Sequence, residues 1–181
     1  MVNDTLLFII FGGVNLLESF LQSLINFFSA LPGELTSFII SALPIVEIKG
    51  GLVAAYYLDI DIVPAFIICV LGNLLPVPFI ILFSRKILNW MKTTKLFKKL
   101  ADKIERHGTG KTSSVTKYKA LGLFIFVAIP LPGTGAWTGA LIAALMNLRL
   151  KDALISITAG VLFLGVLFSL LTYGLLASIG L

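Results

Sequence analysis

The sequence predicts an all-helical integral membrane protein, and its composition supplies the reasons. Of the 181 residues, 58% are hydrophobic, and the mean hydropathy is +1.04. Only 13% of the residues are charged, where a soluble domain has about 25%. These values exclude a disordered chain, a disulfide scaffold and almost any ordinary soluble enzyme. Cys69 is the single cysteine, so no disulfide forms within the chain.

The length is that of one domain, and changes in composition divide it into four parts. These are an N-terminal helix (1–34), a first repeat (35–84), a basic segment (85–118) and a second repeat (119–181). The apolar stretch 6–31 begins without the basic residues of a signal peptide. Four polar residues recur in it at helical spacing: Asn15, Glu18, Gln22 and Asn26. This helix either spans the membrane with that face turned inward or lies at the interface.

The basic segment holds most of the positive charge. Residues 85–119 contain eleven basic side chains against Asp102 and Glu105, which gives +9. In so apolar a chain, the positive-inside rule places this segment in the cytoplasm, and we expect no nucleic acid as a partner. Residues 94–107 have the pattern of a basic amphipathic helix on the anionic inner leaflet. A solvated linker is the alternative.

The first half contains a broken apolar segment and then a complete crossing. Residues 35–58 are apolar but interrupted between Pro44 and Gly51. A three-residue loop, 59–61, follows. Residues 62–84 are then long enough to cross a bilayer at 1.5 Å per residue. We expect kinks at three prolines within this crossing: Pro64, Pro76 and Pro78.

The second half has the same order of elements. Residues 119–147 are apolar but broken at Pro130-Leu-Pro-Gly-Thr-Gly135, and residues 153–181 form a final crossing after a short charged loop. At an offset of 88 residues, Leu43-Pro44 aligns with Leu131-Pro132, which predicts an internal repeat. Broken segments at corresponding places in two halves are the best sequence indication of a transporter's binding site.

Charge asymmetry predicts the orientation of the broken segments. With the basic segment inside, Arg149 and Lys151 are also inside only if the preceding segment enters and leaves on the cytoplasmic side. We therefore predict two re-entrant helical hairpins in inverted orientation. Such hairpins exist only where protein or water satisfies their broken backbone, because lipid cannot.

Two charges lie within the first broken segment. Glu47 and Lys49 stand in an apolar stretch, where a charge costs about 2.5–3.5 kcal/mol and marks a functional candidate. Positions two apart on a regular helix do not face each other, so either the backbone unwinds there or each charge has another partner. The alternative is structural: both residues pair with polar groups such as Asn73 or Glu18 and only stabilise the fold.

The prolines and glycines of both segments suit an anion-binding site. Pro44 and Pro132 fit the first turn of a half-helix, whose free N–H groups attract anions. Lys49 adds a positive charge. The other candidates admit a ligand to the backbone or contact it: Asn73, Gly133, Thr134, Gly135, Trp137 and Thr138. Trp137 either lines the cavity or anchors an interface, and the glycines alternatively serve helix packing.

Several catalytic signatures are missing from the sequence. The only histidine, His107, lies in the basic segment, and no His/Cys cluster has metal-ligand spacing. There is no P-loop and no Gly-x-Ser-x-Gly nucleophile elbow. We therefore predict that the protein is not an enzyme and uses no cofactor or metal.

The two broken segments together resemble a known family. Pro44-Ile-Val-Glu-Ile-Lys-Gly-Gly51 and Pro130-Leu-Pro-Gly-Thr-Gly-Ala-Trp-Thr-Gly139 are similar to the small multidrug export proteins of bacteria and archaea, which are considered distant relatives of the DedA membrane proteins. The resemblance covers about residues 35–180. The family usually has Arg at the position of Lys49, and the exchange keeps the charge but loses the planar, two-pronged donor.

The resemblance implies two inverted repeats, each with a re-entrant hairpin and a crossing helix, and it implies transport. DedA proteins are linked to moving polyprenyl-phosphate lipids and to proton-dependent drug resistance. Carried over by position, the functional residues are Glu47, Lys49, Pro132, Gly133, Thr134, Trp137 and Thr138.

The leading hypothesis is a small secondary transporter or lipid flippase of the plasma membrane. Its substrate would be an anionic amphiphile, above all a polyprenyl phosphate, with the head group on Lys49 and the half-helix N-termini. Glu47 would couple a proton. The alternatives are efflux of cationic drugs, with Glu47 as the counter-charge, and a membrane assembly factor without transport. Association of the chain with itself is left open.

Overall fold

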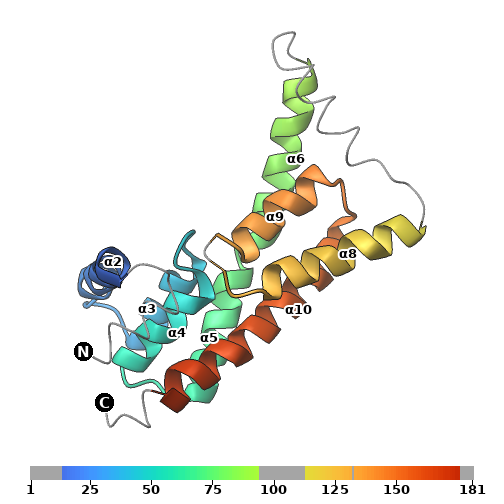
Figure 1. Ribbon diagram of the computed structural model, residues 1–181. Helices are drawn as coiled ribbons and strands as arrows, with labels where there is room; N and C mark the ends of the chain where they lie inside the picture. Colours follow the sequence, from blue (N-terminus) through green and yellow to red (C-terminus); the bar gives the residue numbers. More distant parts are fainter. Residues whose placement is uncertain (1–13, 94–112, 132, 176–181) are drawn as a thin grey trace.

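The computed structural model describes residues 14–93, 113–131 and 133–175, and regular structure in these residues is helical, with no strand among them (Figure 1). The predicted all-helical class is therefore confirmed for the described residues. Residues 94–112 are not described, so the predicted amphipathic helix at 94–107 lies outside the described part, as does Pro132.

Helix α2 (Val14–Phe27) packs with one side against the protein. Leu21 and Ile25 are buried in a small apolar cluster with residues of α3 and α4. The opposite side carries Gln22 and Asn26, which are exposed and hydrogen-bonded to each other at 3.3 Å. Gln22 and Asn26, the described part of the polar face, are thus turned outward. For these two residues, the alternative in which the polar face turns inward is wrong.

The first helical hairpin consists of α3 (Gly33–Ala42) and α4 (Glu47–Tyr57), joined by a four-residue turn (Figure 1). Gly50 and Gly51, expected as part of the interruption, lie inside α4 instead. Gly51 faces Ser41 of α3, and a side-chain carbon at residue 51 would overlap the Ser41 hydroxyl. The two helices of the hairpin pack closely because this position has no side chain.

Helices α5 (Ile62–Leu74) and α6 (Val77–Thr93) form one long apolar rod with a turn at Leu75-Pro76. Residues Ile62–Trp90 are long and apolar enough to cross a membrane. The helix continues past the predicted end at residue 84, and α8 (Ser113–Ala128) begins before residue 119. The basic segment 85–118 is therefore helical at both ends, and residues 85–93 include Arg, Lys, Leu and Met, which are good helix formers.

The second helical hairpin consists of α8 and α9 (Ala136–Leu145), joined by the loop 129–135. The break predicted at residues 130–135 lies within this loop. Helix α10 (Leu150–Ser169) packs along α8 and continues as a π-helix, Leu170–Leu175. Residues Leu150–Gly174 form the second helix that is long and apolar enough to cross. It begins three residues earlier than predicted, at Arg149–Leu150 rather than at residue 153.

The connection that follows each hairpin lies at matching positions 88 residues apart. Helices α4 and α9 end at Tyr57 and Leu145, and the next helices begin at Ile62 and Leu150. In the short connections, Asp59 and Asn147 have positive φ angles of 54° and 51°, a conformation that Asp and Asn tolerate best after glycine. In both connections, the next residue donates its N–H to the carbonyl five residues before it.

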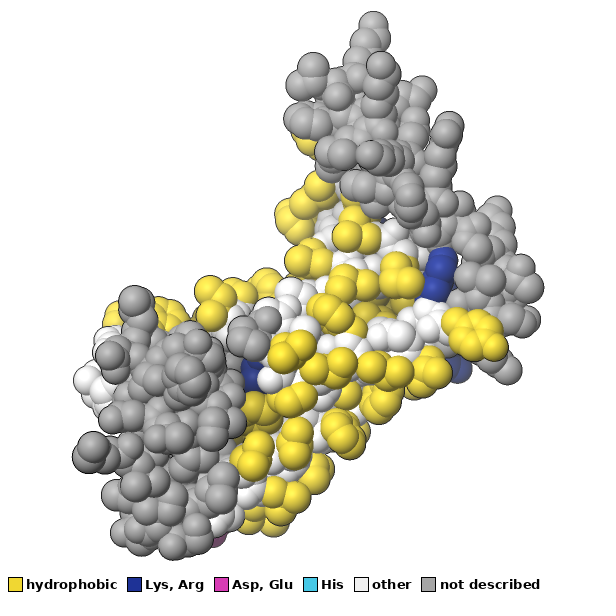
Figure 2. Space-filling view, viewed as in Figure 1, with side chains coloured by type: hydrophobic (Ala, Val, Ile, Leu, Met, Phe, Trp, Pro, Cys, Tyr) yellow, Lys and Arg dark blue, Asp and Glu magenta, His cyan; other side chains and the backbone are white. Residues whose placement is uncertain are grey.

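The main core lies between the two hairpins and the two long helices. It joins side chains of α4, α5, α6, α8, α9 and α10, with Ile48, Leu164 and Phe168 among the largest. Apolar side chains also cover much of the outer surface (Figure 2), including Phe79 on α6 and Phe163 on α10. Large exposed apolar areas on two long helices suggest a membrane protein, because lipid rather than water can contact them.

Candidate functional site

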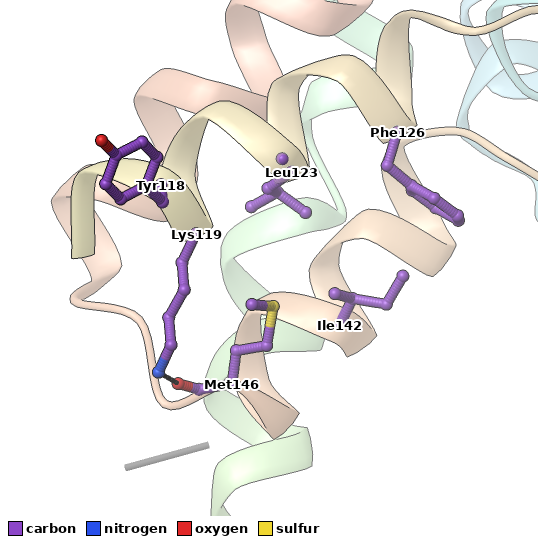
Figure 3. Close-up of a pocket in the computed structure, with 7 residues that line it drawn as sticks. Tyr118, Lys119, Leu123, Phe126, Ile142 and Met146 are labelled. Carbon is purple, nitrogen blue, oxygen red and sulfur yellow. Dashed lines mark hydrogen bonds between the residues drawn. The ribbon is translucent and has the colours of Figure 1, made fainter. Parts of the chain in front are cut away.

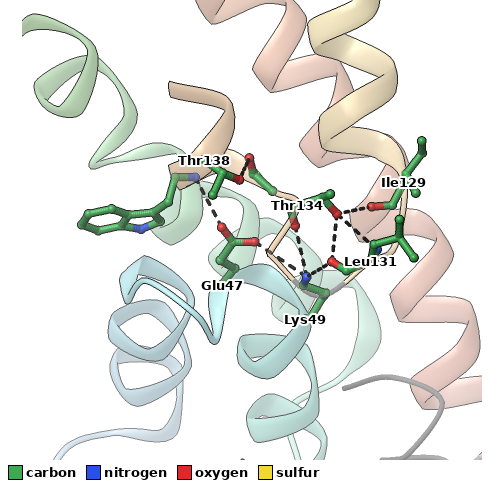
Figure 4. A network of polar contacts seen from close by, with 8 residues as sticks. Glu47, Lys49, Ile129, Leu131, Thr134 and Thr138 are labelled. Carbon is green, nitrogen blue, oxygen red and sulfur yellow. Dashed lines mark hydrogen bonds and ion pairs between the residues drawn. The ribbon is translucent and has the colours of Figure 1, made fainter. Parts of the chain in front are cut away.

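The two hairpins meet end to end in the middle of the structure (Figures 1 and 4). We call this contact the junction. Its residues from the first hairpin are Ala42, Glu47 and Lys49, and from the second Leu131, Thr134, Gly135 and Trp137.

Lys49 connects the first hairpin to the loop of the second. Its Nζ donates to the carbonyl oxygens of Leu131 and Thr134, each at 3.2 Å. The residue lies in the first turn of α4 and is buried, with 4% of its surface exposed. A buried ammonium is tolerated only when such dipoles or charges surround it, so Lys49 holds the loop against α4.

Glu47 connects the first hairpin to the start of α9. Its Oε1 accepts a hydrogen bond from the backbone N–H of Trp137 at 3.3 Å, and its Oε2 lies 3.9 Å from Lys49 Nζ. The carboxyl group is buried as well, at 5% exposure. The first N–H groups of a helix have no partner within the helix and favour negative charge. The anion at the N-terminus of α9 is thus the protein's own carboxylate.

The backbone before α4 departs from helical geometry. Ile45 and Glu47 have φ angles of 78° and 53°. Positive φ is unfavourable for both residues, and strongly so for β-branched Ile45. Both positive φ angles lie where the turn enters α4, and the Glu47 and Lys49 side chains are 3.9 Å apart. Both sequence-based alternatives therefore apply: the backbone is unwound at 45–47, and each charge also has partners in the second hairpin.

Pro44 does not begin the half-helix as predicted. It lies in the turn, and α4 begins three residues later, at Glu47. The N–H of Glu47 donates to the carbonyl of Leu43 at 3.1 Å, and this hydrogen bond closes the turn over Pro44. The proline instead occupies a turn position where its missing N–H costs nothing.

Thr134 stabilises the loop of the second hairpin. Its hydroxyl oxygen lies 2.7 and 2.8 Å from the carbonyl oxygens of Ile129 and Leu131, which share its one hydrogen, and it accepts the backbone N–H of Leu131 at 3.2 Å. These bonds aim the backbone carbonyls of Leu131 and Thr134 toward Lys49 (Figure 4). In this arrangement the residue contributes its carbonyl to the junction, while its hydroxyl is used inside the loop.

The two glycines of the loop differ in their surroundings. Gly133 has a φ of 82° and open space around it, so it serves the turn. Gly135 lies directly against the Glu47 carboxyl group, and a side-chain carbon there would come within 2.6 Å of Oε1 and closer to Oε2. The group that approaches the backbone at Gly135 is therefore Glu47. Thr138 donates its hydroxyl to the Gly135 carbonyl at 3.3 Å.

Trp137 joins the second hairpin to the end of α3. Its indole Nε1 donates to the carbonyl of Ala42 at 3.0 Å, one of the last carbonyls of α3, which lack partners in the helix. Sequence reasoning did not foresee this bond. Asn73 is fully buried on α5, and its amide makes no hydrogen bond to any residue the structure describes. The structural alternative in which Glu47 or Lys49 pairs with Asn73 is therefore not realised in this arrangement.

No group of three or more His, Cys, Asp or Glu residues that could hold a metal occurs within 14–93, 113–131 and 133–175. The junction offers a different chemistry. It has one cation, one carboxylate, and backbone dipoles that neutralise them. Such a set of groups can exchange one anion for another and can take up a proton, but it has no activated nucleophile.

Two helical hairpins that meet at buried charges, beside two long apolar helices, define a small helical membrane protein with a polar centre. The family described as "Putative small multi-drug export protein" matches residues 47–167, which is 121 of 181 residues, and the chain belongs to this family. The resemblance inferred from the two motifs is confirmed. The match includes Glu47, Lys49 and the loop 129–135. The family points to an export protein rather than an enzyme. Comparisons with curated proteins and with solved structures gave no match.

Proposed function

We propose that the protein is a secondary transporter that carries an anionic amphiphile across the plasma membrane, and that the junction is its binding site. The observation that supports this most is the buried ammonium of Lys49, between two hairpins that are far apart in sequence. A charge inside a membrane is costly and is kept where it has a function. Its position where two structural halves meet is where alternating access needs a ligand.

The proposal places the two hairpins in the membrane as re-entrant elements of inverted repeats. Helices α4 and α9 have 11 and 10 residues, about 15–17 Å at 1.5 Å per residue, whereas the hydrocarbon core is about 30 Å thick. Neither can cross alone. The matching positions of elements 88 residues apart support the repeat. In the loop, the carbonyls of Ile129, Leu131 and Thr134 have donors in the Thr134 hydroxyl or the Lys49 ammonium, and backbone at membrane depth requires such partners.

The contacts of Glu47 suggest how binding and proton uptake are coupled. The donors best suited to an anionic head group are the Lys49 ammonium and the Trp137 N–H, and both now face the Glu47 carboxyl group. A phosphate or carboxylate of the substrate would compete for the same donors. Protonation of Glu47 removes that competition, so we infer that a proton enters as the anion binds.

The substrate class follows from the outer surface and the charge. The described surface is apolar around both long helices, so a hydrocarbon tail can stay in the bilayer while only the head group passes through the junction. A lipid phosphate such as polyprenyl phosphate fits these conditions. Lys49 would hold it as a point charge and not as a two-pronged donor.

Efflux of cationic drugs is less well supported by the contacts. The carboxylate that would attract a cation already lies 3.9 Å from Lys49 and accepts the Trp137 N–H. An assembly factor without transport would need neither charge once the protein is folded. The two alternatives therefore predict different effects of neutral substitutions at residues 47 and 49.

The test uses the full chain in vesicles with a fluorescently labelled polyprenyl phosphate, whose head group is quenched from outside. Lys49→Gln should abolish head-group translocation. Lys151→Gln, which changes an exposed lysine at the start of α10, should leave it unchanged. Glu47→Gln should keep binding but lose acceleration by a pH gradient. Unchanged translocation in a folded Lys49→Gln protein would contradict the proposal, and transport of a cationic dye by that variant would favour the drug-efflux alternative.

A further inference from the structure

A second site candidate lies on the surface of the second hairpin, away from the junction. An open groove of about 490 Å³ lies between α8 and α9 (Figure 3). Lys119 and Met146 are at one end, and Phe126 is at the other, with Leu123 and Ile142 between them. Gly122 also lines the groove. Apart from Lys119, its walls offer almost only carbon atoms, which suits a hydrocarbon chain.

A glycine leaves space for this groove. A side-chain carbon at Gly122 would have no atom within 4 Å. By contrast, such carbons at Gly139 and Gly160 would come within 2.6 and 2.7 Å of Val127. Those two glycines allow close helix packing, whereas a side chain at residue 122 would meet none of the residues that the structure describes. The lack of a side chain at residue 122 therefore widens the groove and does not tighten the fold.

Positive charge gathers at the Lys119 end. Lys119 Nζ lies 3.5 Å from the carbonyl of Met146, the residue that follows α9. Arg85 of α6 donates to the carbonyl of Leu148, two residues further on. Among the described residues that line the groove, none is acidic. Tyr118, exposed at the same end, is of the type enriched where lipid head groups begin.

We propose that this groove binds one acyl chain of an anionic phospholipid, with the phosphate at Lys119. An apolar channel that is charged at one end only is complementary to an amphiphile with a negative head, and it is not complementary to a neutral or cationic lipid. The site depends on the protein lying in a membrane, but not on transport at the junction. Bound lipid would contact α8 at Phe126, three residues before the loop whose carbonyls hold Lys49.

The test is native mass spectrometry of the full chain with phosphatidylglycerol or phosphatidylcholine of identical acyl chains. We expect about five-fold more retained phosphatidylglycerol, since one basic residue at a membrane surface contributes about 1 kcal/mol. Lys119→Gln should remove this preference and keep the weaker binding of phosphatidylcholine. Lys151→Gln, a lysine outside the groove, should keep the preference.

A second pair of variants tests the place of the acyl chain. Gly122→Phe should fill the groove without disturbing the fold and lower retention of both lipids at least five-fold. Ile125→Phe, on an exposed position of the same helix outside the groove, should not. Lys49→Gln should leave lipid retention unchanged, which separates this site from the junction. Equal retention of both lipids by the unmodified chain, or normal retention by Gly122→Phe, would overturn the proposal.

Discussion

The contact between Gly135 and Glu47 makes the sharpest prediction about the junction. In Gly135→Ala, the new methyl group would overlap the Glu47 carboxyl group, whose Oε1 lies 2.6 Å from the methyl position. The carboxyl group must then rotate away. It would give up the hydrogen bond from the Trp137 N–H and its position beside Lys49. The substitution thus breaks the junction without removing any of its polar groups.

The expected cost follows from these two interactions of the carboxyl group. A hydrogen bond to a charged group contributes about 1.5–3 kcal/mol, and breaking a buried ion pair costs about 3–5 kcal/mol. Lys49 keeps its bonds to Leu131 and Thr134, so we take the lower end, about 3 kcal/mol of unfolding free energy. Gly133→Ala is the control. A side-chain carbon at residue 133 would meet no atom of the described residues within 4 Å. This substitution should therefore lower the unfolding free energy only by the strain of a positive φ, about 1–2 kcal/mol.

A double-mutant cycle measures the contact directly. Unfolding free energies would be obtained in mixed micelles by titration with a denaturing detergent and followed by tryptophan fluorescence. In a Glu47→Ala background, Gly135→Ala has no carboxyl group to displace and should cost only the backbone strain of an alanine at φ 159° and ψ −163°, about 1 kcal/mol. The coupling energy is then about 2 kcal/mol. If Gly135→Ala costs the same in both backgrounds, the carboxyl group does not lie against residue 135, and the junction described above is wrong.

Three further substitutions test the packing and strain around the junction by the same titration. Gly72→Ala would drive a methyl group into the backbone carbonyl of Phe38 and should lower stability by about 1–3 kcal/mol; a loss under about 0.5 kcal/mol would contradict this contact. Trp137→Phe keeps an aromatic ring but removes the donor to Ala42, at a cost of about 0.5–1.5 kcal/mol, and an unchanged stability would show that the bond is not made. Ile45→Gly relieves a φ of 78° at an exposed side chain, about 1–2 kcal/mol of strain, against about 0.5–1 kcal/mol of added chain entropy. It should leave stability unchanged or slightly higher, and a decrease above about 1 kcal/mol would refute the strained turn.

Local signals in the sequence predicted the positions of the breaks. Prolines and glycines interrupt apolar stretches at 44–51 and 130–135, and both interruptions lie at or near the turns of the two hairpins. The two charges in an apolar segment were also found from the sequence alone. Both signals consist of residues that are close together in the sequence. They can therefore be recognised without knowledge of the fold. Helix ends were less accurate, as residues 85–93 show, since loop and helix have similar compositions there.

Partners across the junction could not be predicted from the sequence. Lys49 bonds residues 82 and 85 positions away, and Glu47 bonds a residue 90 positions away. A backbone carbonyl exists at every residue and an N–H at every residue but proline, so no side-chain pattern marks the ones that are used. This limit matters most at the N-terminus of α9. Residue types in the sequence predicted a ligand there, whereas in the structure the Glu47 carboxyl group accepts the Trp137 N–H.

The division of charge between the hairpins has a consequence for the proposed transport. Both charged groups of the junction belong to α4, whereas the second hairpin contributes only neutral dipoles: two carbonyls and two N–H groups. When both side chains are ionised, their charges sum to zero, which low-dielectric surroundings favour. A monoanion that binds beside Lys49 would bring the sum to −1 unless Glu47 takes up a proton. Entry of one proton with each monoanion restores neutrality, so in the proposed transport the junction favours electroneutral movement of a monoanion with one proton over movement of the anion alone.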